Sequence, residues 1–313
     1  MNKIDYLVIS STIDYSTDLV CYELLKQGKK YYRVNRDEFK LHTIIMDLEK
    51  KSMFFEIEGE CYIAEFDSLK GIYYRAPVFL RIQSKDILSI EEQLEKSQWS
   101  AFLRNLIVFE KANWINNPVD TYRAENKGYQ LLVAESKGLI VPKTYITNDK
   151  DVQVDENSLY VVKGIDTALL YDMKNGAELF TYTTVLKGSE LKECNLHCAP
   201  VFVQEYLGHK VDCRITYVDG KCFPVKITSG KKGVFGDWRK NKNEVEYQMF
   251  ELPDDIKSKI TNFMEELKLK FGGIDLIQSN GKYYFIEVNP TGEWAWLEDR
   301  TGMNISKEIA SAL

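Results

Sequence analysis

Histidine is scarce in this chain, and so are the arrangements that most nucleophilic enzymes need. Only three of the 313 residues are histidine, and no Ser/His/Asp or Cys/His arrangement is apparent. The sequence therefore gives no indication of an acyl-enzyme mechanism. No Gly-x-Gly-x-x-Gly follows the first predicted strand at residues 6–10, so a dinucleotide site is not predicted either.

The cysteines lack the pairing pattern of a disulfide scaffold. Six of them are scattered along the chain, at positions 21, 61, 194, 198, 213 and 222. Cys194, His197 and Cys198 suggest zinc at first sight, but no second ligand pair follows at a suitable spacing. We interpret the thiols as buried or incidental.

Long apolar runs and an excess of positive charge are also missing. No run approaches membrane-spanning length, and the first six residues do not resemble a signal peptide. The net charge of −6 argues against general binding to nucleic acid or to an anionic membrane. With 44% hydrophobic and 28% charged residues, the chain suits a globular protein of two or three lobes. We expect it in the cytoplasm.

The most informative stretch of the chain is residues 271–298. Asn280-Gly281 is a strong hairpin signal between two apolar and aromatic runs. The first run carries Asp275, and the second carries Glu287 and Asn289, which lie two apart and so leave the same face of a strand. Two carboxylates and one amide oxygen form a hard oxygen set, which suits Mg²⁺.

Two readings of this hairpin are open. Ile286 and Val288 are expected to point the other way, into a core. A surface hairpin with a solvated acidic face is the alternative to a metal site. The apolar setting favours the metal site, because charged groups in such a stretch usually have partners.

The same stretch resembles the C-terminal metal strands of ATP-grasp ligases. In those enzymes an Asp on one strand and a Glu-x-Asn on the next hold magnesium against a nucleoside triphosphate. The ending Asn-Pro-Thr-Gly-Glu-Trp-Ala-Trp-Leu-Glu (289–298) is similar, more specifically, to the graspetide (microviridin-type) macrocyclases. The resemblance implies an ATP-grasp fold of the α/β class with α+β lobes, with ATP and Mg²⁺ as cofactors.

The order of the predicted elements fits this expectation. Residues 1–117 begin with a strand–helix–strand unit of the kind that builds parallel sheets, and we expect them to form an N-terminal pre-ATP-grasp domain. Residues 118–200 are expected to form the central lobe, and residues 201–313 an antiparallel C-terminal lobe with the metal site. Four N-terminal segments resemble the same domain of the macrocyclases: residues 10–14, 33–39, 73–77 and 99–106. Arg75, in the third of them, either reaches the active-site cleft or is an ordinary structural arginine.

Two lysines match the phosphate-binding lysines of ATP-grasp enzymes. Lys127 lies in the first half of a helix predicted over residues 120–137, where a lysine alone is usually a solvated charge. Lys163 ends the predicted strand Tyr160-Val-Val-Lys163, and a lysine there serves as a compact point charge for phosphate oxygens. Many ATP-grasp enzymes continue with a glycine-rich loop, whereas this chain has only Gly164 and then a hairpin expected to turn at Asn175-Gly176.

The segment 201–207 alternates apolar and polar residues and breaks at Gly208. In ATP-grasp enzymes this strand ends at the hinge between lobes, where backbone groups pair with adenine. Gln204, Glu205 and Leu207 match those positions.

Asp212 and Arg214 share one face of the next predicted strand. One interpretation is a surface ion pair worth under about 1 kcal/mol. The other, which the macrocyclase motif Asp-x-Arg favours, is a guanidinium that Asp212 holds in place and that grips a carboxylate or phosphate with two hydrogen bonds. Residues 236–239 resemble the family's Asp-Trp-Arg segment, which implies that Arg239 faces the triphosphate or the transferring phosphoryl group.

Together these residues predict an anion-handling cleft suited to phosphoryl transfer. The resemblance implies an ATP-dependent macrocyclase, with catalytic residues Asp212, Arg214 and Arg239, that acts on a precursor peptide made of a leader and a core. It implies ring closure between Asp or Glu and Thr or Ser as esters first, or Lys as amides second, and a homodimer. An ATP-grasp ligase that joins separate molecules and a nucleotide-binding regulatory module remain alternatives.

Overall fold

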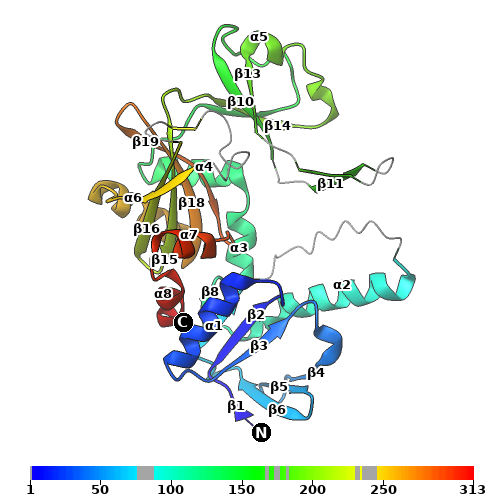
Figure 1. Ribbon diagram of the computed structural model, residues 1–313. Helices are drawn as coiled ribbons and strands as arrows, with labels where there is room; N and C mark the ends of the chain where they lie inside the picture. Colours follow the sequence, from blue (N-terminus) through cyan, green and yellow to red (C-terminus); the bar gives the residue numbers. More distant parts are fainter. Residues whose placement is uncertain are drawn as a thin grey trace.

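The computed structural model describes residues 2–75, 88–165, 169–172, 177–180, 183–229, 233–234 and 245–313. Figure 1 shows three tiers: the N-terminal elements at one end, an antiparallel sheet in the middle and a smaller sheet at the other end. The middle tier is the C-terminal sheet, although its strands follow the smaller sheet in the sequence.

The N-terminal tier contains a parallel sheet in the order β3-β2-β7-β8. Its strand β2 is buried along its whole length, as expected for a parallel strand that is covered on both faces. A second sheet, in the order β1-β6-β5-β4, lies beside it. The strands of this tier are β1 (Asn2–Lys3), β2 (Tyr6–Ser10), β3 (Tyr31–Asn35), β4 (Thr43–Asp47), β5 (Ser52–Ile57), β6 (Glu60–Glu65), β7 (Gly71–Tyr74) and β8 (Asn113–Ile115).

Caps set the helix boundaries of this tier. The Asp14 side chain accepts a hydrogen bond from the backbone N–H of Thr17 and so starts α1. Gly28, with φ of +67°, follows its end. Ser89 and Glu92 form a capping box at the start of the long helix α2. The helical elements here are α1 (Tyr15–Lys26), α2 (Ile90–Asn105) and the 3-10 turns η1 (Phe39–Leu41) and η2 (Leu106–Val108).

The C-terminal sheet is antiparallel, in the order β17-β16-β15-β18-β19. Tight two-residue turns join β15 to β16 and β18 to β19, and the predicted Asn280-Gly281 turn is confirmed, with φ of 49° and 76°. The helices α3, α4 and α6 pack on one face and form one large core with it. The elements of this tier are α3 (Pro118–Ala124), α4 (Lys127–Ser136), β15 (Val211–Val218), β16 (Lys221–Thr228), β17 (Glu246–Met249), α6 (Asp254–Glu266), β18 (Phe271–Ser279), β19 (Lys282–Asn289), α7 (Ala295–Thr301) and α8 (Ile305–Ala312).

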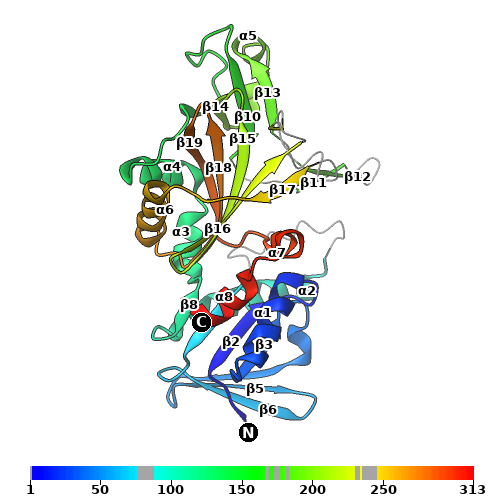
Figure 2. The same ribbon diagram turned by 60° about the vertical axis from the view of Figure 1, so that its left-hand side comes forward.

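The first two tiers share a core. Val8 and Tyr73 of the parallel sheet belong to the same buried cluster as Val218 and Phe271 of the C-terminal sheet and Ile309 of α8. Helix α8 packs along α1, as both views show (Figure 2). These tiers are therefore joined by apolar burial and not by a linker alone.

The central lobe has a sheet in the order β13-β10-β14-β9 and a separate two-stranded pair, β11-β12. Where the structure describes this lobe, its own buried cluster consists of Leu191, Leu196 and Val203. The elements are β9 (Thr144–Thr147), β10 (Leu159–Gly164), β11 (Leu169–Asp172), β12 (Ala177–Phe180), β13 (Thr184–Lys187), α5 (Gly188–Leu191), η3 (Leu196–Cys198) and β14 (Val201–Glu205).

Three segments, α3, α4 and β14, lie in other tiers than the expected division placed them. β14 pairs with β9 and β10 in the central sheet, although a boundary at residue 200 assigns it to the C-terminal lobe. Helix α4 packs on β19, although it belongs by sequence to residues 118–200. The three-part division itself stays a prediction. Across the described ranges, no helix has the length and apolar character needed to cross a membrane.

Candidate active site

Three predicted metal ligands lie together on the face of the C-terminal sheet opposite α6. Asp275 of β18 stands directly across from Glu287 of β19, and Asn289 follows two residues later on the same side. The register shifts between Asp275 and Leu276, so that Ile286 is an extra residue on β19. This bulge corrects one expectation: Phe285 and Val288 point into the core and are buried, whereas Ile286 is only partly buried.

The outer edge of β19 is held by side-chain and backbone groups of another segment. Gln130 of α4, 1% exposed, accepts a hydrogen bond from the Val288 N–H at 2.9 Å and donates to the Val288 carbonyl at 2.9 Å. Ile140 bonds the same edge three residues earlier, where its carbonyl accepts a hydrogen bond from the Phe285 N–H at 2.7 Å. Gln130 therefore fixes the residue that lies between Glu287 and Asn289.

Arg214 of β15 reaches over Asp275, its direct neighbour across the sheet. Its Nη1 donates to both carboxylate oxygens of Asp275, at 3.0 and 3.1 Å. Two glycines make room for it: a Cβ on Gly273 would lie 2.1 Å from Nη2, and one on Gly292 would lie 2.6 Å from it. The buried Nε has no hydrogen-bond partner among the described residues, and a buried donor of this kind is usually satisfied by a ligand or water.

Asp212, expected to hold Arg214, has another observed partner. Lys210 Nζ lies 2.8 and 2.6 Å from the two Asp212 carboxylate oxygens, and the Lys210 side chain is 8% exposed. The carboxylate that hydrogen-bonds Arg214 is that of Asp275. Between them, Cys213 points into the core, where burial raises its pKa to about 12. This thiol is therefore not a nucleophile at neutral pH.

Lys127 is the first residue of α4 and not a mid-helix residue, which corrects the single helix predicted over 120–137. The break comes from Asn126, whose side-chain amide donates to the carbonyls of Tyr122 and Arg123 and so ends α3. Lys127 Nζ lies 3.1 Å from a carboxylate oxygen of Glu287. The N-terminus of a helix and a lysine at the same point favour an anion there.

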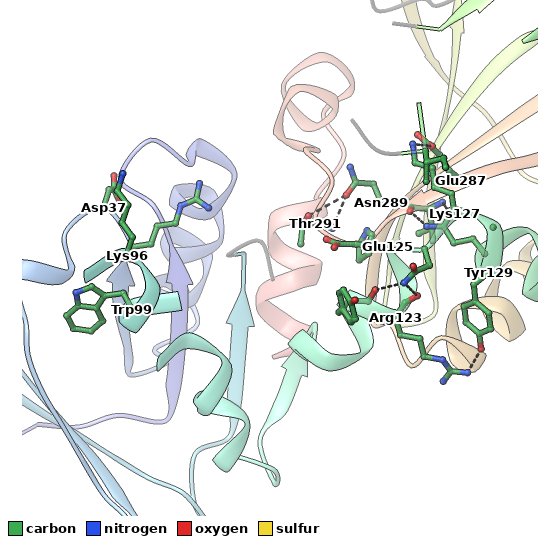
Figure 3. Close-up of a pocket in the computed structure, with 18 of the residues that line it drawn as sticks. Asp37, Lys96, Trp99, Arg123, Glu125, Lys127, Tyr129, Glu287, Asn289 and Thr291 are labelled. Atoms are coloured by element: carbon green, nitrogen blue, oxygen red, sulfur yellow. Dashed lines mark hydrogen bonds and ion pairs between the residues drawn. The ribbon is translucent and has the colours of Figure 1, made fainter. Parts of the chain in front are cut away.

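A cleft of about 1550 Å³ opens beside these groups. Figure 3 shows its two walls: Asp37, Lys96 and Trp99 of the N-terminal tier face Glu125 and Lys127 across the opening. Glu287 and Asn289 line it as well. The cleft is large enough for a peptide segment as well as a small molecule.

The other predicted nucleotide residues lie in or next to the central lobe. Lys163 is on β10, with its Nζ 5.7 Å from the centre of the Phe202 ring. Gln204 is 3% exposed and donates to the Thr144 hydroxyl at 2.8 Å. Glu205 ends β14, and Leu207, 8% exposed, follows in the segment that leads to β15.

Arg239 and the Asn175-Gly176 turn lie outside the described residues. Within the described residues, no group of three or more His, Cys, Asp or Glu side chains could hold a metal. The expected site has two carboxylates and one amide, and this donor set on one sheet face fits Mg²⁺, which binds few protein oxygens and keeps several waters. The structure brings Asp275, Glu287, Asn289, Lys127 and Arg214 together, and Asp212 lies two residues before Arg214 on β15.

Sequence reasoning missed the residues that hold these groups in place. Besides Gln130, the buried Asn116 donates to the carbonyls of Phe271 and Pro290 and accepts from the N–H groups of Lys270 and Phe271. It therefore joins the N-terminal tier to the start of β18 and to the end of β19. A buried polar residue of this kind has no periodic signal in the sequence.

Comparison with known proteins was consistent with this geometry. A RimK-like ATP-grasp domain family matches residues 181–313. The chain is 27% identical to a RiPP-associated ATP-grasp ligase of Chryseobacterium gregarium, solved with ADP and with a leader and a core peptide. The two structures agree with a TM-score of 0.86 over 100% of this chain and 96% of that one. This chain is an ATP-grasp ligase.

Two further proteins are similar to this chain, one in fold and one in sequence. It has the fold of the macrocyclase MdnC of Microcystis aeruginosa, solved with the precursor peptide MdnA, at 22% identity and a TM-score of 0.83, with 98% of each chain covered. It is 25% identical to the tetrahydromethanopterin:alpha-L-glutamate ligase of Methanocaldococcus jannaschii over 226 residues, which are 67% of this chain and 74% of that one. The predicted fold class is confirmed.

Proposed function

We propose that the ligase closes rings in a ribosomally made precursor peptide at the expense of ATP. The observation that carries this proposal is the likeness to the Chryseobacterium ligase over the whole chain, N-terminal tier included. That tier supplies one wall of the cleft beside Glu287 and Asn289, where a peptide would lie next to the reacting groups.

Mg²⁺ would be held by Asp275, Glu287 and Asn289, and when bound it would neutralise charge on the phosphate oxygens. Lys127 and Lys163 would bind the same phosphates from two sides as point charges. Gln204, Glu205 and Leu207 would border the adenine. In the structure Lys127 pairs with Glu287 and Arg214 with Asp275, so the anion-binding groups are already balanced by the carboxylates.

Arg214 would hold the acceptor carboxylate of the peptide through its Nε and Nη2 donors, while Nη1 stays on Asp275. A carboxylate oxygen then attacks the γ-phosphorus, ADP leaves, and an acyl phosphate forms. A Thr or Ser hydroxyl of the same peptide attacks the acyl carbon, loses its proton, and releases phosphate, which carries away the oxygen that made the attack. The products are an ester ring, ADP and phosphate. Asp212 and Arg239 are proposed to support this chemistry.

Two chemical variants of this reaction are the alternatives. A Lys amine in place of the hydroxyl gives an amide ring by the same steps. An amino acid joined from a separate molecule gives an intermolecular ligase, and the match to the glutamate ligase of M. jannaschii favours this second function. A leader that binds away from the reacting groups, Mg²⁺ dependence, a homodimer and a cytoplasmic location belong to the proposal as well.

Mass spectrometry of a candidate precursor incubated with the ligase, ATP and Mg²⁺ tests the proposal. We expect product masses that fall in steps of one water, and we expect hydroxide treatment to restore the mass because it opens esters. Arg214→Ala should give no product, and the exposed Lys221→Ala should give as much as the wild type. Resistance to hydroxide would mean amides, and a mass that rises by one amino-acid residue would replace the macrocyclase with an intermolecular ligase.

A further inference from the structure

A buried arginine of the N-terminal tier makes several contacts with the loop that follows β19, where Asn116 also donates to the Pro290 carbonyl at 2.9 Å and the Ser16 hydroxyl donates to a Glu293 carboxylate oxygen at 2.8 Å. Arg75 directly follows β7, and its side chain is 3% exposed. Its Nη1 donates to the carbonyls of Thr291 at 2.7 Å and Gly292 at 3.3 Å, and its Nη2 donates to a Glu293 carboxylate oxygen at 2.7 Å. Two of its three nitrogens therefore bind a segment more than two hundred residues away.

The third nitrogen anchors Arg75 in its own tier. Nε lies 3.3 Å from a carboxylate oxygen of Asp14. Asp14 is in turn held by the Ser10 hydroxyl at 2.8 Å and by the Thr17 hydroxyl at 2.9 Å. Burial alone would raise the pKa of Asp14, but Arg75 and these hydroxyls outweigh it and lower the pKa below its usual value. The anchor therefore stays charged at neutral pH.

The segment 291–293, which Arg75 contacts, in turn contacts two groups of the candidate active site. The Asn289 side-chain oxygen accepts a hydrogen bond from the Thr291 N–H at 3.1 Å, and its backbone carbonyl accepts from the Gly292 N–H at 3.2 Å. On the other side, Nη2 of Arg214 lies 3.5 Å from the Glu293 carbonyl, and Gly292 packs against the same nitrogen.

We propose that Arg75 is a positioning residue for catalysis, which sets the places of Arg214 and Asn289 through the backbone of residues 291–293. Any displacement of this backbone moves a donor of the Arg214 fork and a candidate metal ligand together. Because a misplacement of about 1 Å can cost about a hundredfold in rate, the contact has a catalytic effect although Arg75 does not touch the reacting atoms. The inference rests on the proposed function for its kinetic test only.

Arg33 offers a matched control in the same tier. All three nitrogens of its guanidinium donate as well, to Asp18 at 2.5 Å, to Asn35 at 2.8 Å and to the Ser11 carbonyl at 2.6 Å. All of these partners belong to the N-terminal tier. Arg33→Ala therefore removes a comparable structural network without releasing the loop.

The first measurement is hydrogen exchange of the segment 289–296 in the full chain without ligands. We expect exchange of the Thr291 and Gly292 amides at least about tenfold faster in Arg75→Ala and unchanged in Arg33→Ala, because local opening follows the loss of local contacts. Equal exchange in the wild type and Arg75→Ala would overturn the proposal. This readout does not depend on any peptide substrate.

The second measurement is the rate of ADP formation with the precursor. We expect kcat to fall about tenfold to a hundredfold in Arg75→Ala, with KM for ATP within about threefold, and partial recovery in Arg75→Lys, which keeps the charge but not the fork. A fall of the same size in Arg33→Ala would show a general loss of structure and would refute the positioning role. If the wild-type ligase modifies no peptide, the proposed function fails, while the exchange result still decides the role of Arg75.

Discussion

The two lobes that would enclose ATP differ greatly in the number of buried apolar residues that stabilise them. The C-terminal sheet has a core of twenty buried residues on one face and shares a second core with the N-terminal tier. Among the described residues, the central lobe has three buried residues in a cluster of its own, and Phe202 of its strand β14 belongs to the core of the C-terminal sheet. Arg214 and the candidate metal ligands lie on the first body, whereas Lys163 and Gln204 lie on the second. We infer that the reacting groups and Lys127 of α4 are placed on a rigid frame, and the other nucleotide contacts on a lobe that can open locally.

The largest expected effect is on the two cores. Phe285 is fully buried in the C-terminal core, and Phe285→Ala should lower the free energy of unfolding by about 3–5 kcal/mol. Leu191 is fully buried in the central lobe, and Leu191→Ala should destabilise that lobe and leave the rest of the protein folded. Limited proteolysis with mapped cleavage sites separates the two outcomes. Cleavage spread over all tiers in Leu191→Ala would mean that the lobes unfold as one unit.

Arg214→Ala tests the catalytic role of the C-terminal sheet at the site itself. Loss of the donors that hold the acceptor carboxylate should lower kcat by at least about 10²–10³-fold, which leaves no detectable product in the precursor assay. We expect the affinity for ADP to change less than about threefold. Steady-state kinetics and calorimetric titration with ADP measure the two quantities. Arg214→Lys is the matched variant, since it keeps the charge and loses the fork. Wild-type kcat in either variant would remove Arg214 from the mechanism.

Lys163→Ala should give the opposite pattern and a smaller effect. A lost phosphate contact on the central lobe is expected to raise the ADP dissociation constant about tenfold, which corresponds to about 1.4 kcal/mol. Lys187, on the neighbouring strand β13 of the same sheet, provides the control. Lys187→Ala should bind ADP as tightly as the wild type does. An unchanged dissociation constant in Lys163→Ala would leave the proposed phosphate role without support.

The cysteines report the same difference without loss of function. Cys198 of the central lobe is exposed, whereas Cys213 of β15 is 1% exposed and its pKa is raised by burial to about 12. At pH 8 a thiol reagent should modify Cys198 readily and leave Cys213 unmodified. The raised pKa of Cys213 also makes the stability of the fold depend on pH. Its contribution to stability is fully present below pH 9.0, the pKa of the thiol in the unfolded chain, and is lost as the pH rises toward about 12. Rapid labelling of Cys213 in the folded ligase would show that the C-terminal sheet opens.

The residues that the sequence predicts best are those whose side chains follow a strand period. Spacing places Glu287 and Asn289 on one face of their strand, and the structure has them there. Asp275 lies opposite Glu287 only because of the bulge, since a regular register from the Asn280-Gly281 turn would pair Asp275 with Ile286. Ile286 was misplaced because a bulge shifts the pattern by one residue, and nothing in the local sequence marks the bulge.

Partners that come from distant segments could not be predicted in the same way. Arg214 pairs with Asp275 and Asp212 with Lys210, and the first of these pairings depends on strand order that only the folded sheet fixes. The buried amides of Asn116 and Gln130 satisfy backbone groups of β18 and β19 across more than 150 residues. Such contacts follow from the need to pair buried polar groups, but that need does not say which side chain meets it.

The most direct test of the central claim follows an oxygen atom. A precursor whose Asp and Glu side-chain carboxylates carry a heavy oxygen isotope would be incubated with the ligase, Mg²⁺ and ATP, and the released phosphate analysed by mass spectrometry. If the ligase activates the carboxylate as an acyl phosphate, each water lost from the peptide leaves one heavy oxygen in phosphate, and Arg214→Ala gives neither. A peptide that loses water while the phosphate stays unlabelled would contradict the account.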